Sequence, residues 1–162
     1  MHVVAISGET VDCLHVEEAP DPRSAPLQLK WLDVFETGNA EIDRIHRKLL
    51  ADCNALLSII SAGAGWPVII VRAKRLVEDC VAHFRLEESI LGRTQFARLA
   101  EHQAEHQRLE HEMRRAVERM EKRDDAFSDR FEHARWLGGL LVDAIVRNDL
   151  DFRSHILNEQ GR

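Results

Sequence analysis

The chain has 162 residues, a length that corresponds to a single domain with one sizeable core. It contains no Tyr, eight Gly and four Pro, and this composition favours an all-α fold over a β-sandwich or a β-barrel. Its formal net charge of −6 comes from interspersed acidic and basic residues, which offer no basic stripe for nucleic acid and no polybasic segment for a membrane surface.

Residues 1–28 differ in composition from the rest of the chain. Two short β-like runs, HVVAI and VDCLHV, surround SGET, and the three prolines of EEAPDPRSAP exclude a helix. We interpret this part as an N-terminal extension that can form a small hairpin and that ends in a linker. Residues 29–162 are then the domain.

Four helices are expected in that domain. Gly, Pro and polar residues interrupt the helical pattern at AGAGWP (62–67), GRTQF (92–96) and KRDDAFS (122–128). The helices are estimated at 40–61, 67–91, 97–121 and 126–158. Because short connections force neighbouring helices to run antiparallel, the sequence predicts an up-down-up-down four-helix bundle.

Each predicted helix carries an inward stripe at alternating three- and four-residue steps, the period that faces a bundle core. Polar residues interrupt all four stripes, and in the last helix the stripe turns Asp149 inward while Asp143 and Asp151 lie on the opposite face. The stripes are Ile42, His46, Leu49, Cys53, Leu56 and Ile60; Leu76, Cys80, His83, Glu87 and Ile90; Leu99, His102, His106, Leu109 and Met113; and Phe131, Ala134, Leu141, Ile145, Asp149, Phe152 and Ile156.

The inward polar residues fall at one end of an antiparallel bundle. A buried carboxylate or imidazole without a partner is costly, so these groups should satisfy one another or hold something between them. Four imidazoles and two carboxylates form a ligand set suited to iron, and two carboxylates could bridge two irons. The predicted metal ligands are His46, His83, Glu87, His102, His106 and Asp149. A purely structural set of histidines is the alternative, and Asp149 could also reach water near a helix end.

These residues resemble the haemerythrin family, specifically the bacterial haemerythrin-like domains, from about Trp31 to the C-terminus. The segment WLDVFETGNAEIDRIHRKLLADCNAL (31–56) is similar to the family's opening motif, which contains the ligand His46. HFRLEE (83–88) is similar to the second motif, and FARLAEHQAEH (96–106) to the third.

The fourth motif of the family is His-Ile, three residues, then Asp. Placed on Asp149 it reads AIVRND, with Ala144 where the family has a fifth ligand His. A second register, based on Trp136-Leu137, puts Leu140 at the His and Ile145 at the Asp and loses both ligands. The register on Asp149 is preferred because it keeps the inward carboxylate.

The resemblance implies two iron ions in an oxo- or hydroxo-bridged centre that binds dioxygen. One iron is then held by His46 and His83, the other by His102 and His106, and Glu87 and Asp149 bridge them. Because Ala144 supplies no ligand, the second iron is expected to be more open. His155 and Glu110 are the candidate substitutes for the missing His.

The expected function is therefore that of a dioxygen or redox sensor or a carrier, not an enzyme. A di-iron redox enzyme acting on peroxide or nitric oxide, and a metal-free helical interaction module, are the alternatives. A sensor would need a protein partner or the N-terminal extension. No run approaches the roughly 18 apolar residues of a spanning helix and no signal peptide is recognisable, so a cytoplasmic protein with reduced Cys13, Cys53 and Cys80 is expected.

Overall fold

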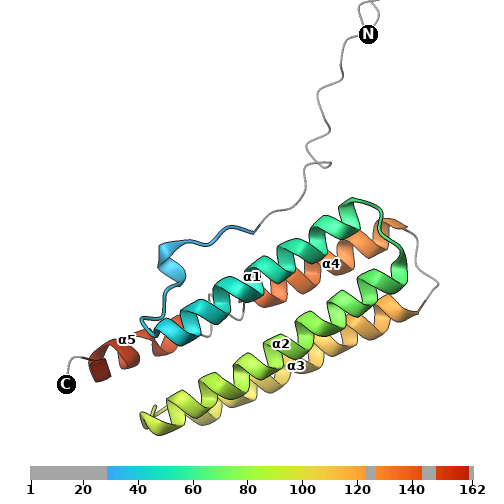
Figure 1. Cartoon of the computed structure of the whole chain (residues 1–162). Helices are drawn as coiled ribbons and strands as arrows, with labels where there is room; N and C mark the ends of the chain where they lie inside the picture. Colours follow the sequence, from blue (N-terminus) through green and yellow to red (C-terminus); the bar gives the residue numbers. More distant parts are fainter. Residues whose placement is uncertain (1–28, 123–126, 144–148, 161–162) are drawn as a thin grey trace, which may run out of the picture.

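The computed structural model describes residues 29–122, 127–143 and 149–160. Its helices are α1 (Ala40–Ser61), α2 (Trp66–Arg93), α3 (Leu99–Glu121), α4 (Phe127–Asp143) and α5 (Asp149–Gln160), preceded by the 3-10 helix η1 (Asp33–Phe35). Helices α1 to α4 pack as an antiparallel bundle (Figure 1), and no strand occurs in the described ranges. The predicted all-α bundle is confirmed. The predicted extension over residues 1–28 lies outside the described residues, so the domain boundary stays a prediction.

The helix bounds follow local signals in the sequence. Helix α1 begins where predicted because the side chain of Asn39 caps it, accepting hydrogen bonds from the backbone N–H groups of Glu41 and Ile42. Helix α2 has Pro67 in its first turn, a position that needs no backbone donor. The predicted helix 126–158 corresponds to two helices, α4 and α5, on either side of residues 144–148, which are outside the described part.

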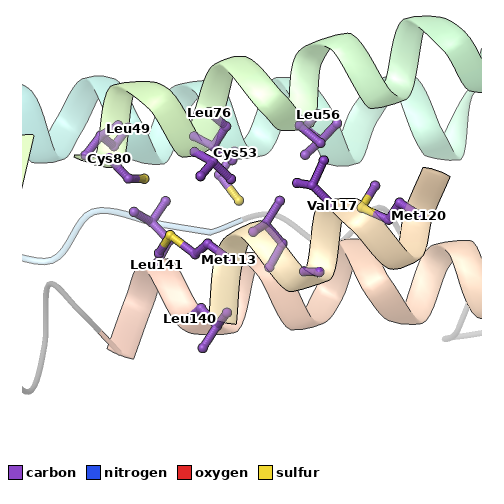
Figure 2. Close-up of a cluster of buried hydrophobic side chains, with 14 of the residues drawn as sticks. Leu49, Cys53, Leu56, Leu76, Cys80, Met113, Val117, Met120, Leu140 and Leu141 are labelled. Carbon is purple, nitrogen blue, oxygen red and sulfur yellow. The ribbon is translucent and has the colours of Figure 1, made fainter. Parts of the chain in front are cut away.

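Two apolar clusters fill the interior. The larger one lies between α1, α2, α3 and α4, and includes Leu49 and Cys53 of α1, Cys80 of α2 and Met113 of α3 (Figure 2). The predicted inward residues of α1 and α2 are all buried, as are Leu109 and Met113, whereas Leu99 is only half-buried. Leu140 and Leu141 of α4 complete this cluster, so Leu140, the position that the rejected register gave to a His, packs among aliphatic and sulfur-containing side chains.

The smaller cluster joins α5 to the other end of the bundle. Its buried members are Ile42, Ile90, Leu91, Phe152 and Ile156. In α1, α2 and α3 the predicted polar residues fall between residues of the smaller and the larger cluster: in α1, for example, Ile42 precedes His46 and Leu49 follows it. The polar residues therefore form one layer between two apolar regions.

The segment before α1 is packed closely against this end of the bundle. The backbone N–H and the hydroxyl of Thr37 both donate to Oδ1 of Asp43, at 2.7 and 2.8 Å. Gly38 has a φ of +90°, and a Cβ at that position would come within 2.7 Å of Cδ2 of Leu157 in α5. Glycine meets both requirements, a left-handed backbone and the close approach of α5.

Candidate metal centre

Five of the six predicted ligands come together in the polar layer. His46 projects from α1, His83 and Glu87 from α2, and His102 and His106 from α3, and all five are buried. Their nitrogen and oxygen atoms form two groups, each within 4.8 Å: one of His46, His83 and Glu87, the other of Glu87, His102 and His106. Glu87 belongs to both groups, as expected for a carboxylate shared between two ions.

The sixth predicted ligand, Asp149, is the first residue of α5, but its side chain is outside the described part of the structure, as is that of Asp151. Ala144 also lies outside the described residues. Asp143, expected to face solvent, is partly exposed.

The two oxygens of Glu87 face different pairs of histidines. Oε1 lies 2.5 Å from Nε2 of His102 and 3.4 Å from Nε2 of His106. Oε2 lies 3.2 Å from Nε2 of His83 and 3.9 Å from Nε2 of His46. The carboxylate therefore stands between two imidazole pairs, with one oxygen turned to each pair.

Glu87 is a carboxylate at neutral pH in this environment. Burial by itself would raise its pKa, but the surrounding imidazoles of His102, His106 and His83 outweigh that effect and hold the pKa well below its usual range. The side chain is completely buried, and Oε2 accepts no hydrogen bond from the described residues. A buried anionic oxygen without a donor has capacity left for a cation.

The histidine pair on the other oxygen fits a cation as well. Nε2 of His46 and Nε2 of His83 lie 2.9 Å apart, and only one of two neutral imidazoles can donate in such a pair. On the opposite side, the proton of His102 Nε2 is directed at Glu87, so a cation bound there would displace it. Imidazole nitrogens and a carboxylate are ligands that suit iron, and the residues present therefore fit a metal centre.

Aromatic rings enclose these ligands. The ring of Phe84 stacks on His106, with centroids 4.1 Å apart and an interplanar angle of 13°. Phe152 of α5 meets His102 edge-on at 5.5 Å, and Trp31 lies 6.4 Å from His46. The guanidinium of Arg47 covers the Trp31 ring at 4.6 Å. This shell limits the access of water to the polar layer.

Neither candidate substitute for the missing His joins the two groups. His155 lies beside Phe96 and bonds the hydroxyl of Thr94 at 3.0 Å, and it is partly buried although it was expected at the surface. Glu110 accepts a hydrogen bond from Arg114, one turn further along α3. Sequence reasoning missed Glu88, whose carboxylate bonds His106 Nδ1 at 2.8 Å. The Glu-Glu pair in HFRLEE was the signal that could have found it.

An antiparallel helical bundle with a buried carboxylate between two histidine pairs defines a class of proteins, the helical bundles that bind cations in their core. The model of one family, the Hemerythrin HHE cation binding domain, matches residues 37–161, and the chain belongs to that family. Comparisons with curated proteins and with solved structures found no match. None of the described helices is both long enough and apolar enough to cross a membrane.

Proposed function

We propose that this chain holds a di-iron centre and binds dioxygen, as an oxygen or redox sensor or as a carrier. The proposed ligands are His46, His83, Glu87, His102, His106 and Asp149. The observation that carries the proposal is the position of Glu87, which turns one buried oxygen toward each of two histidine pairs. If these residues hold two iron ions, the centre would supply the electrons for reversible binding of dioxygen.

The chain's own residues would set the properties of such a centre. The apolar clusters on both sides of the polar layer exclude water from it, which strengthens the interaction between the Glu87 carboxylate and a cation. Phe84 and Phe152 limit the rotation of the His106 and His102 rings, so the imidazoles meet a cation with little loss of conformational freedom.

Asp149 is the proposed second bridging carboxylate. It lies three residues before Phe152, and Phe152 touches the His102 ring, so the first turn of α5 begins close to the level of the ligands. Ala144 stands where the family has a fifth His, and an alanine offers no ligand atom. We therefore propose that the iron position at His102 and His106 is more open to exchange, which favours rapid oxidation and a sensing role over storage.

Metal analysis and the visible spectrum test this function. The full chain is loaded with Fe²⁺ under anaerobic conditions, and spectra are recorded before and after oxygen is admitted. We expect about two irons per chain and charge-transfer bands that depend on oxygen. Absence of bound iron would overturn the proposal, and one iron per chain would overturn its di-iron part. Rapid turnover of peroxide or nitric oxide would establish the enzymatic alternative instead.

The role of Ala144 has its own test. Ala144→His should slow the oxidation of the loaded protein, because it restores a ligand at the open position. The matched control is Ala55→His, which adds an imidazole at an exposed position of α1. An unchanged oxidation rate in Ala144→His would contradict the register that aligns Asp149 with the family.

A further inference from the structure

We propose that Glu88 is a positioning residue of this metal site, which fixes the tautomer and the ring orientation of His106. The inference rests on the proposed metal-binding function and adds a residue to it. Glu88 follows Glu87 in α2, and the helical rotation of about 100° per residue turns it away from the polar layer and toward α3. Two adjacent glutamates therefore reach the same histidine from two sides.

Both oxygens of Glu88 are bound to one face of α3. Oε1 accepts a hydrogen bond from Nδ1 of His106 at 2.8 Å, and Oε2 accepts one from the side-chain amide of Gln103 at 3.3 Å. Gln103 and His106 are three residues apart, which places them on the same side of α3. The carboxylate is held at two points, so its direction toward the imidazole is fixed.

This contact decides which nitrogen of His106 is available to a metal. An imidazole whose Nδ1–H donates to a carboxylate has its lone pair on Nε2 when it is neutral. Nε2 of His106 is the nitrogen that faces Glu87, at 3.4 Å from Oε1. Phe84 stacked on the ring holds its plane, and Glu88 holds its rotation within that plane. Partners of this kind also raise the basicity of a metal-binding histidine.

The histidines on the two sides of Glu87 differ in the hydrogen bonds that their Nδ1 atoms make. Nδ1 of His83 is buried and has no hydrogen-bond partner within the described ranges. Among the proposed ligands whose side chains the structure describes, Glu88 in contrast contacts only His106. Removing the Glu88 carboxylate should therefore weaken one of two bound metal ions much more than the other.

Two substitutions at one position separate the hydrogen bond from the charge. Glu88→Leu removes the acceptor and keeps a side chain of similar size, whereas Glu88→Gln keeps an acceptor oxygen and loses the charge. Metal-free full-length protein is titrated with Zn²⁺ against a chromophoric chelator. Glu88→Leu should weaken one of the two binding events by about 10- to 100-fold, and Glu88→Gln should recover most of that loss.

The control variant is Glu112→Leu. Its carboxylate has a side-chain exposure of 33%, close to the 23% of Glu88, and it pairs with Arg108 on α3. The ¹⁵N resonance of His106 Nδ1 in the zinc-loaded protein supplies a second measurement. Its chemical shift should change in Glu88→Leu and should stay the same in Glu112→Leu.

The outcomes distinguish this inference from the proposed function. If the unmodified chain binds no Zn²⁺ and no Fe²⁺, the proposed metal-binding function is overturned, and the positioning role is overturned with it. If the chain binds metal and Glu88→Leu binds it equally well, only the positioning role is overturned. It is also overturned if Glu88→Leu and Glu88→Gln lose affinity in proportion to a common loss of folding stability, as measured by urea denaturation of the metal-free variants.

Discussion

Asp43→Ala should destabilise the metal-free protein far more than a typical loss of an acidic residue. Asp43 lies one turn before His46 in α1, and its Oδ1 accepts hydrogen bonds from both the N–H and the hydroxyl of Thr37. Asp43 is only 7% exposed and Thr37 is completely buried, so no water replaces the lost acceptor easily. The substitution leaves two buried donors of Thr37 without this acceptor.

The magnitude follows from these two bonds. A hydrogen bond to a charged group contributes about 1.5–3 kcal/mol, so two of them set an upper range of about 3–6 kcal/mol. Relaxation of the Thr37 hydroxyl should recover part of this loss, and we expect a decrease of about 3 kcal/mol in the free energy of unfolding. For a domain of this size that corresponds to a melting temperature lower by roughly 6–12 °C. Asp43→Asn keeps the acceptor oxygen without the charge, so it should cost less.

Urea denaturation followed by circular dichroism measures the effect, with a chelator present so that metal binding does not contribute. The matched control is Asp52→Ala, in the same helix, whose exposed carboxylate pairs with Lys48. An exposed pair of this kind is worth about 0–1 kcal/mol. A loss below about 1 kcal/mol for Asp43→Ala, or a loss equal to that of Asp52→Ala, would refute the argument from burial.

Three further results are expected. Glu87→Gln should weaken both metal-binding events by at least about 100-fold, because the carboxylate is shared; a metal titration in which only one event weakens would contradict this. The free energy of unfolding of the metal-free chain should decrease as the pH is lowered from about 4.3, the pKa of Glu in an unfolded chain, because the pKa of Glu87 in the fold is held well below that value. In urea denaturation across pH 3–7, the free energy of unfolding of Glu87→Gln should depend less on pH than that of the unmodified chain. In a Cys13→Ser background, neither remaining thiol should react with a disulfide reagent at pH 8 until the protein is denatured. Burial raises the pKa of Cys53 to about 12 and raises that of Cys80 as well. Labelling of the native protein at the rate of an exposed thiol would contradict this.

Three helices could be predicted closely from the sequence because their ends carry local signals. Asn39 caps α1, Pro67 opens α2, and the observed bounds of α2 and α3 differ from the predicted ones by at most two residues. The last predicted helix, 126–158, is described only as α4 and α5, and its continuity across residues 144–148, which lie outside the described part, stays a prediction.

The candidate site also has a part that could be predicted from the sequence and a part that stays a prediction. Spacing along each helix was enough to bring His46, His83, Glu87, His102 and His106 to one level, because a helix has a fixed rise and a fixed rotation per residue. The inward position of Asp149 and the consequence of Ala144 stay predictions, since the described structure does not include the Asp149 side chain or Ala144.

The sequence by itself determined the helices, their inward faces and the convergence of the polar residues, because each of these depends on periodicity within one helix. Only the tertiary structure decided which oxygen of Glu87 faces which histidines, that Glu88 reaches His106, and that Gly38 makes room for Leu157. Those contacts join different elements, and they depend on how each helix is rotated against its neighbours and on the rotamers of long side chains. No repeat within a single helix encodes either quantity.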